Sequence, residues 1–341
     1  MNDVKQRVLV TGGTGYLAGW CIAMLLEQGY RVRTTVRSAA REQAVRDGVS
    51  TIVDPGDRLE FAVADLTADA GWGGAVAGCE HVLHVASPLG DENPRDADRL
   101  IAPARDGALR VLRAATAAGV RRVVMTSAAN AASPASYTAD GCTDETLWTL
   151  DHPSLPAYRR SKTLAERAAW DFMAGHAGPT TLATVLPGAV FGPLLSTANL
   201  GSVRIVQRLL QGRMPGVPRI GLEVVDVRDV ADLHLRAMIA PAAAGERFLG
   251  TGEFMWMREI AAALRAGLGD AGTGVPTRQL PDVAVRLAAV VDRSLRPIMP
   301  GLGRRNRHST EKARRILGWQ PRPAADVVVD CARSLLEHKI V

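Results

Sequence analysis

The chain has 341 residues, of which 47% are hydrophobic, so it is long enough for one large α/β domain or for a nucleotide-binding domain with a smaller lobe. Its four widely spaced cysteines form no Cys-x-x-Cys pair, which argues against a zinc site or a disulfide framework and favours a reducing cytoplasm. The net charge of +6 comes from 41 basic and 35 acidic residues, spread along the chain without the interleaved aromatic residues of a nucleic-acid surface. The polar N-terminus and the short apolar runs indicate neither a signal peptide nor a membrane span, so we expect a cytoplasmic protein.

Short apolar strands alternate with helical patterns through the first half of the chain. Strands are expected at residues 7–11, 31–36, 58–63, 81–86, 121–126 and 180–186. Helices are expected at residues 17–28, 94–118 and 156–176. This alternation predicts a Rossmann-type, doubly wound α/β fold, with a parallel sheet covered by helices on both faces.

A glycine-rich turn, Thr11-Gly12-Gly13-Thr14-Gly15, joins the first strand to the first helix. A turn without side chains lets backbone N–H groups approach a pyrophosphate, and the helix N-terminus adds partial positive charge. The strand before the turn and the helix after it make this a dinucleotide-binding signature. The residues expected to contact the cofactor here are Thr11, Gly12, Thr14, Gly15, Tyr16 and Leu17.

The end of the second strand indicates which dinucleotide binds. NAD enzymes usually place an acidic residue there to hold the ribose 2′-hydroxyl, but this strand ends in Val36-Arg37-Ser38. The Arg37 guanidinium suits a 2′-phosphate through paired hydrogen bonds, with Arg33 as a second candidate, which favours NADP. The neighbouring strand ends add Asp65, Leu66, Val85, Ala86 and Ser87 to the expected cofactor site.

Tyr158 and Lys162 are four residues apart in the expected helix 156–176 and therefore share one helix face. A lysine ammonium near a phenol lowers the phenol pKa, so Tyr158 can exchange a proton near neutral pH. The same lysine can bond the nicotinamide ribose. The pair therefore predicts hydride transfer with Tyr158 handling the proton of the substrate oxygen.

After residue 187, glycines and prolines interrupt the pattern. Short elements are expected at residues 203–210, 223–227, 230–239, 258–268, 283–291 and 310–317. The predicted organisation is an NADP-binding Rossmann domain over residues 1–187 and a smaller C-terminal substrate lobe over residues 188–341, with some segments returning to the Rossmann domain.

Together these motifs resemble the extended short-chain dehydrogenases/reductases, in particular the dihydroflavonol reductase and cinnamoyl-CoA reductase branch with its microbial ketoreductase relatives. The resemblance spans nearly the whole chain and lies in residues 11–17, 35–37, 64–66, 78–79, 84–88, 121–127, 158–166, 187–188 and 191–193. It implies NADP-dependent reduction of a ketone or aldehyde, with Arg37 on the 2′-phosphate. Thr126, Pro187 and Val190 complete the expected cofactor site, and Ser133 and Phe191 are expected to face the substrate.

One position departs from the family pattern. The resemblance implies a catalytic serine after the fifth strand, within Thr-Ser-Ser-Ala, but residues 126–129 read Thr-Ser-Ala-Ala, so Ala128 stands in its place. Three interpretations stay open. Ser127 takes the role through a local shift, which we favour; or Thr126, Asn130 or Ser133 supplies the donor; or Tyr158 works with Lys162 alone.

Two other functions share this scaffold. One is an epimerase, dehydratase or hydroxysteroid-type dehydrogenase, which usually has an acidic residue where this chain has Arg37. The other is a redox sensor that binds NADP without chemistry, which would need neither Tyr158 nor Lys162. We expect no metal, because the histidines show no ligand spacing, and a monomer or homodimer acting on a small carbonyl compound.

Overall fold

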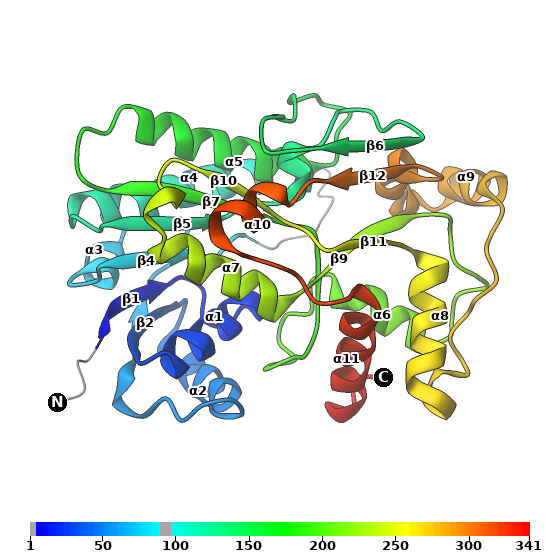
Figure 1. Cartoon of the computed structure of the whole chain (residues 1–341), viewed down its shortest axis with the longest axis horizontal. Helices are drawn as coiled ribbons and strands as arrows, with labels where there is room; N and C mark the ends of the chain where they lie inside the picture. Colours follow the sequence, from blue (N-terminus) through cyan, green and yellow to red (C-terminus); the bar gives the residue numbers. More distant parts are fainter. Residues whose placement is uncertain (1–4, 89–96) are drawn as a thin grey trace.

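The computed structural model describes residues 5–88 and 97–341. Its centre is a sheet of seven strands in the order β10-β7-β5-β4-β1-β2-β3, and every neighbouring pair is parallel (Figure 1). The strands are β1 (Lys5–Val10), β2 (Tyr30–Val36), β3 (Leu59–Val63), β4 (His81–His84), β5 (Arg122–Thr126), β7 (Thr181–Pro187) and β10 (Arg247–Gly250). The predicted Rossmann-type fold is confirmed, and six of these strands lie where the sequence placed them.

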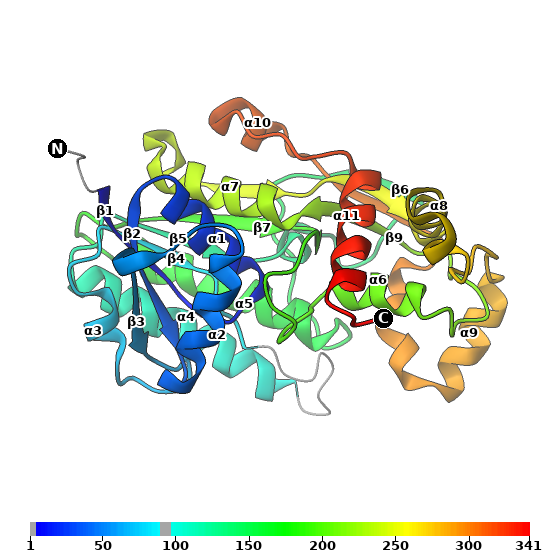
Figure 2. The ribbon, with the colours of Figure 1, turned by 90° about the horizontal axis from the view of Figure 1, so that it is seen from below.

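Helices cover both faces of the sheet, because alternate side chains of each buried strand point in opposite directions. Val8 and Val10 pack into the core under α1 (Tyr16–Glu27) and α7 (Val227–Ile239), whereas Leu9 packs into the opposite core. That second core contains α4 (Asp98–Ala117) and α5 (Ala157–Ala174). Figure 2 shows the sheet between these two helix layers. The predicted start of α4 falls partly outside the described residues.

A second group of elements lies beside the sheet, on the right in Figure 1. It contains a three-stranded sheet of β8 (Ala189–Phe191), β9 (Gly221–Asp226) and β11 (Glu253–Trp256) and a two-stranded pair of β6 (Asp140–Thr143) and β12 (Arg305–His308). Its helices are α6 (Val203–Leu210), α8 (Met257–Leu268), α9 (Asp282–Val291) and α11 (Ala324–Glu337). A separate hydrophobic core joins α6, α8 and α11 to β9.

The remaining helices of the described residues are short. They are α2 (Glu42–Ser50), α3 (Trp72–Val76) and α10 (Glu311–Leu317), and six 3₁₀ segments accompany them there, of which η3 (Ala129–Ala132) is the next element after β5. The sequence did not predict β10, although this strand adds to the edge of the central sheet beside β7. It also did not predict the pairing of β6 with β12.

The chain crosses the predicted domain boundary at residue 187 in both directions. β10 and α7 come from the later half yet lie on the central sheet, whereas β6 comes from the earlier half and pairs with β12. The division itself stays a prediction. Within residues 5–88 and 97–341, no helix is long and apolar enough to cross a membrane.

Candidate functional site

The predicted site residues gather at the carboxyl ends of the central strands. The glycine turn follows β1, Arg37 follows β2, and Asp65 comes two residues after β3. Val85, Ala86 and Ser87 follow β4, Ser127 follows β5, and Pro187 ends β7, whereas Val190 lies in β8. The strand order reverses between β1 and β4, and this is where a doubly wound sheet opens a crevice for a ligand.

The glycine turn packs tightly between β2 and the segment after β4. Gly12 has a φ of +75°, and a Cβ there would lie 2.9 Å from the Cβ of Ala86. A Cβ on Gly13 would lie 2.5 Å from Oγ1 of Thr34, so neither position accepts a side chain. The Gly12 N–H donates to Oγ1 of Thr35 at 2.8 Å, which fixes the turn on β2.

The N-terminus of α1 offers the donors that an anion needs. Gly15 is its N-cap and provides no side-chain cap, and the first turn of the helix contains no acidic residue. The N–H groups at the start of the helix, which include those of Tyr16 and Leu17, therefore lack a capping side chain and carry the positive end of the helix dipole. A pyrophosphate fits this arrangement.

Thr11 connects the glycine turn to His84 at the end of β4. Its hydroxyl accepts from the Ala86 N–H at 2.9 Å and lies 3.0 Å from Nδ1 of His84. Burial, together with the charge of Lys162, lowers the pKa of His84 to about 3, so the imidazole is neutral. A hydrogen bond between Thr11 and the neutral imidazole thus connects the glycine turn to the end of β4. The sequence placed His84 among the residues that carry the family resemblance but gave it no role in the site, because this contact with Thr11 joins residues 73 positions apart.

Arg37 is exposed directly after β2. The Thr67 N–H and then the Thr67 hydroxyl, which donate to one oxygen of Asp65, hold the pKa of that carboxyl below its ordinary value, and the charge of Arg37 adds a smaller effect in the same direction. These two bonds form a tight turn that fixes the carboxylate after β3.

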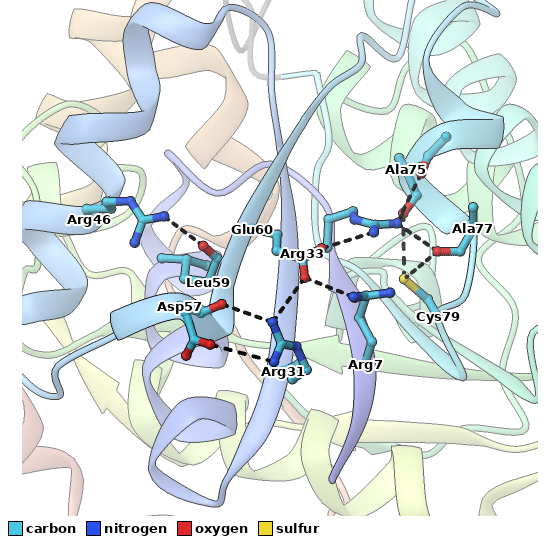
Figure 3. A network of polar contacts seen from close by, with 11 residues as sticks. Arg7, Arg31, Arg33, Arg46, Asp57, Leu59, Glu60, Ala75, Ala77 and Cys79 are labelled. Carbon is cyan, nitrogen blue, oxygen red and sulfur yellow. Dashed lines mark hydrogen bonds and ion pairs between the residues drawn. The ribbon is translucent and has the colours of Figure 1, made fainter. Parts of the chain in front are cut away.

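Arg33 does not accompany Arg37, so its interpretation as a second phosphate ligand is wrong. Its guanidinium donates to Glu60 at 3.0 Å and to carbonyl oxygens at the end of α3, those of Gly74, Ala75 and Ala77 (Figure 3). Glu60 also pairs with Arg7 and Arg31. Arg33 therefore connects β2 to α3 and β3, and three residues separate it from Arg37 along the chain.

Tyr158 and Lys162 lie in the first two turns of α5, which begins after Pro156. Lys162 is 7% exposed, and burial lowers its pKa to about 8, against a smaller opposing effect of Glu166. Arg159, between Tyr158 and Lys162 in the sequence, donates to the carbonyl oxygen of Asn130 in the segment after β5. This contact fixes the start of α5 beside the carboxyl end of β5, and the role of the pair stays a prediction.

Ser127 turns its hydroxyl toward a buried carboxylate. It donates to Oε2 of Glu166 at 2.6 Å, and Glu166 has no exposed surface. Thr184 donates to the other oxygen of Glu166 at 2.8 Å, and Arg247 of β10 donates to the same oxygen at 2.9 Å. Ser127 could reach a substrate only by giving up this bond, and its catalytic role stays a prediction.

Three other predicted residues are also bound or buried. The Thr126 hydroxyl lies 2.7 Å from Nε2 of His234, and the Ser133 hydroxyl lies 2.9 Å from Nε2 of His308. Phe191 has no exposed surface and belongs to the core that includes α6 and β9. Ser133 has no exposed surface either, so contact of either residue with a substrate would require its side chain to become exposed.

Sequence reasoning also missed Arg247 and Arg159. Arg247 stacks on Trp148, 3.6 Å from the ring centre, and donates to the carbonyl of Glu145. Arg159, next to Tyr158, donates to the carbonyls of Ser133 and Pro134 at 2.6 and 2.7 Å. Nothing in the sequence distinguishes these arginines from surface ones. No cluster of three potential metal ligands exists among the residues described.

The chain is similar to known proteins in both sequence and fold. Residues 8–249 match the model of the family described as "NAD dependent epimerase/dehydratase family". A putative anthocyanidin reductase of Ginkgo biloba is 34% identical over 257 residues, 70% of this chain and 73% of that protein. A cinnamoyl-CoA reductase of Medicago truncatula, CAD2, is 34% identical over 254 residues, 73% of this chain and 77% of that protein.

The fold also matches solved structures over almost its full length. The crystal structure of Gre2 in complex with NADPH from Candida albicans superposes with a TM-score of 0.81. The alignment has 25% sequence identity and covers 98% of this chain and 99% of that chain.

Proposed function

The chain belongs to the NAD dependent epimerase/dehydratase family, and we propose that it is an NADPH-dependent reductase of a ketone or aldehyde. The observation that carries the proposal is the position of Tyr158 and Lys162. They lie one helical turn apart on α5, and Arg159 between them donates to the carbonyl oxygen of Asn130 in the segment after β5. This contact supports a proton donor at the carboxyl ends of the central strands, the same edge at which the glycine turn follows β1.

The residues at the strand ends fit NADPH. The uncapped N-terminus of α1 suits the pyrophosphate, and the exposed Arg37 guanidinium suits the 2′-phosphate. Asp65 would face the adenine, and Leu66, Val85, Ala86, Ser87, Thr126, Pro187 and Val190 would line the remaining path of the cofactor. When bound, the nicotinamide supplies the hydride that reduces the carbonyl carbon.

The protein's part in the reaction is to hold the carbonyl and supply its proton. The Tyr158 hydroxyl donates a hydrogen bond to the carbonyl oxygen and transfers its proton as negative charge develops there. The buried Lys162 ammonium favours the phenolate that remains and bonds the nicotinamide ribose. Ser133 and Phe191, which are fully buried, would support the substrate-binding surface from the interior of the protein.

One experiment distinguishes the reductase from the two alternative functions, a redox sensor and an epimerase, dehydratase or hydroxysteroid-type dehydrogenase. The protein is incubated with NADPH and a panel of aryl ketones, aldehydes and diketones while nicotinamide absorbance is followed. Oxidation of NADPH that depends on one class of carbonyl compound supports the reductase. Tight NADPH binding without oxidation across the panel overturns it in favour of a redox sensor. Tight binding of NAD, with conversion of a sugar nucleotide or a hydroxysteroid, would favour the epimerase, dehydratase or hydroxysteroid dehydrogenase instead.

A further inference from the structure

In the family pattern that the chain resembles, a serine hydroxyl donates a hydrogen bond to the carbonyl oxygen of the substrate. Ala128 stands in the place of that serine and has no such donor. The segment from Thr126 to Ser133 carries three hydroxyl groups and one carboxamide as candidate replacements for that donor. The structure allows the destination of each hydroxyl proton to be traced.

The Thr126 proton goes to His234. Nδ1 of His234 lies 2.7 Å from the Val230 carbonyl oxygen, which can only accept, so Nδ1 carries the imidazole proton. Burial lowers the pKa of His234 to about 4, so the ring is neutral and Nε2 is an acceptor. Thr126, at 2.7 Å from Nε2, must therefore donate to it.

The two serine protons are also directed into the protein. Ser127 donates to Glu166, whose carboxylate only accepts. The Ser133 hydroxyl lies 3.1 Å from the Ala129 carbonyl and 2.9 Å from Nε2 of His308, so its proton has an internal acceptor. Neither serine is more than 2% exposed.

Asn130 differs from the neighbouring serines in its exposure and in the availability of its hydrogen-bond donors. Within residues 127–133 it is the one side chain that is not buried. Its carboxamide has no hydrogen-bond partner among the residues that the structure describes, so its two N–H donors remain available.

The backbone of Asn130 is fixed next to the helix segment that carries Tyr158. Its carbonyl oxygen accepts from Thr149 Oγ1 at 2.6 Å and from Nε of Arg159 at 3.2 Å. Arg159 directly follows Tyr158 and is 4% exposed. These bonds hold residue 130 in place before a substrate arrives, as an effective donor requires.

We propose that the Asn130 carboxamide donates an N–H hydrogen bond to the carbonyl oxygen of the ketone or aldehyde substrate, in place of the hydroxyl that Ala128 lacks. The bond strengthens as the oxygen gains negative charge and transfers no proton, since Tyr158 supplies the proton. This proposal rests on the reductase function.

Two variants separate the donor from the shape of the side chain. Asn130→Ala removes the group, whereas Asn130→Asp keeps its size but replaces the N–H donors with an acceptor. Each is assayed with NADPH and the best carbonyl substrate of the panel, and NADPH affinity is measured by fluorescence titration. We expect kcat about 100-fold lower in both variants, with the Kd for NADPH unchanged.

An Asn130→Asp variant that keeps the wild-type kcat overturns the proposal, because it retains shape without a donor. If Asn130→Ala loses NADPH binding through misfolding, the Asp variant decides alone. Failure of the reductase function looks different, because the wild-type protein would then oxidise no NADPH with any carbonyl compound.

Discussion

The Ser127 hydroxyl donates to the Glu166 carboxylate across 2.6 Å, and neither side chain is more than 2% exposed. A buried hydrogen bond to a charged group contributes about 2 kcal/mol to stability. Ser127→Ala should therefore lower the free energy of unfolding by about 2 kcal/mol and leave kcat nearly unchanged. Urea denaturation and steady-state assays check both. A large fall in kcat without loss of stability would instead support the prediction that Ser127 contacts the substrate.

The ion pair between Glu166 and Arg247 connects α5 to β10 inside the protein. The Arg247 side chain is 8% exposed, Glu166 is fully buried, and the two are 2.9 Å apart. Removing one partner leaves an uncompensated buried charge, so Arg247→Met should lower the free energy of unfolding by about 3–5 kcal/mol. Arg247→Met with Glu166→Leu should recover part of that loss in urea denaturation. Equal stability of the single variant and the wild type would contradict this.

Lys162 should set the alkaline limit of activity. Its pKa falls from 10.5 in an exposed lysine to about 8 through burial, so the free enzyme loses this positive charge above pH 8. We expect kcat/KM for NADPH to fall about tenfold per pH unit above that point. A profile that stays flat to pH 10 would contradict the assignment.

Deprotonation of Lys162 should raise the stability of the fold, although it lowers activity. Between pH 8 and 10.5 the unfolded chain keeps a proton that the folded lysine releases, so the free energy of unfolding rises with pH across this window. Burial of the charge costs stability below pH 8. Lys162→Met should remove this rise in urea titrations at several pH values, which provides the matched control for the activity profile.

Arg37 should determine the choice of cofactor. Arg37→Ala removes charge-assisted bonds to a 2′-phosphate, so KM for NADPH should rise about 10- to 100-fold while KM for NADH stays the same. Arg33→Ala is the control, because Arg33 bonds Glu60 and the end of α3 and should leave the NADPH to NADH ratio unchanged. An unaltered ratio in Arg37→Ala would place the 2′-phosphate elsewhere.

The central sheet and the family were predictable because their signals are local. Apolar runs marked the strands, the glycine turn lay between strand and helix, and α6 was found at its observed bounds. The resemblance to the cinnamoyl-CoA reductase branch is confirmed by relatives with those names. In contrast, β10 is four residues long, and β12 reads Arg-Asn-Arg-His, so neither carries a strand pattern.

The side-chain partners around the site were not predictable, since they depend on distant parts of the chain. Arg33 differs from Arg37 through its proximity to α3, 41 or more residues away. The Ser127 hydroxyl donates to Glu166, and the negative charge of Glu166 is compensated by Arg247, 81 residues further along the chain. Position in a motif indicates which residues lie at the carboxyl ends of the strands, whereas the folded contacts decide which hydrogen-bond donors remain available there.

The most direct test of the reductase account is turnover by Tyr158→Phe. This variant keeps the ring and loses the proton donor, so steady-state oxidation of NADPH with the best carbonyl substrate should fall at least 100-fold. NADPH affinity, measured by fluorescence titration, should match that of the wild type. Unchanged turnover in Tyr158→Phe would contradict the account, because the proton would then come from another group.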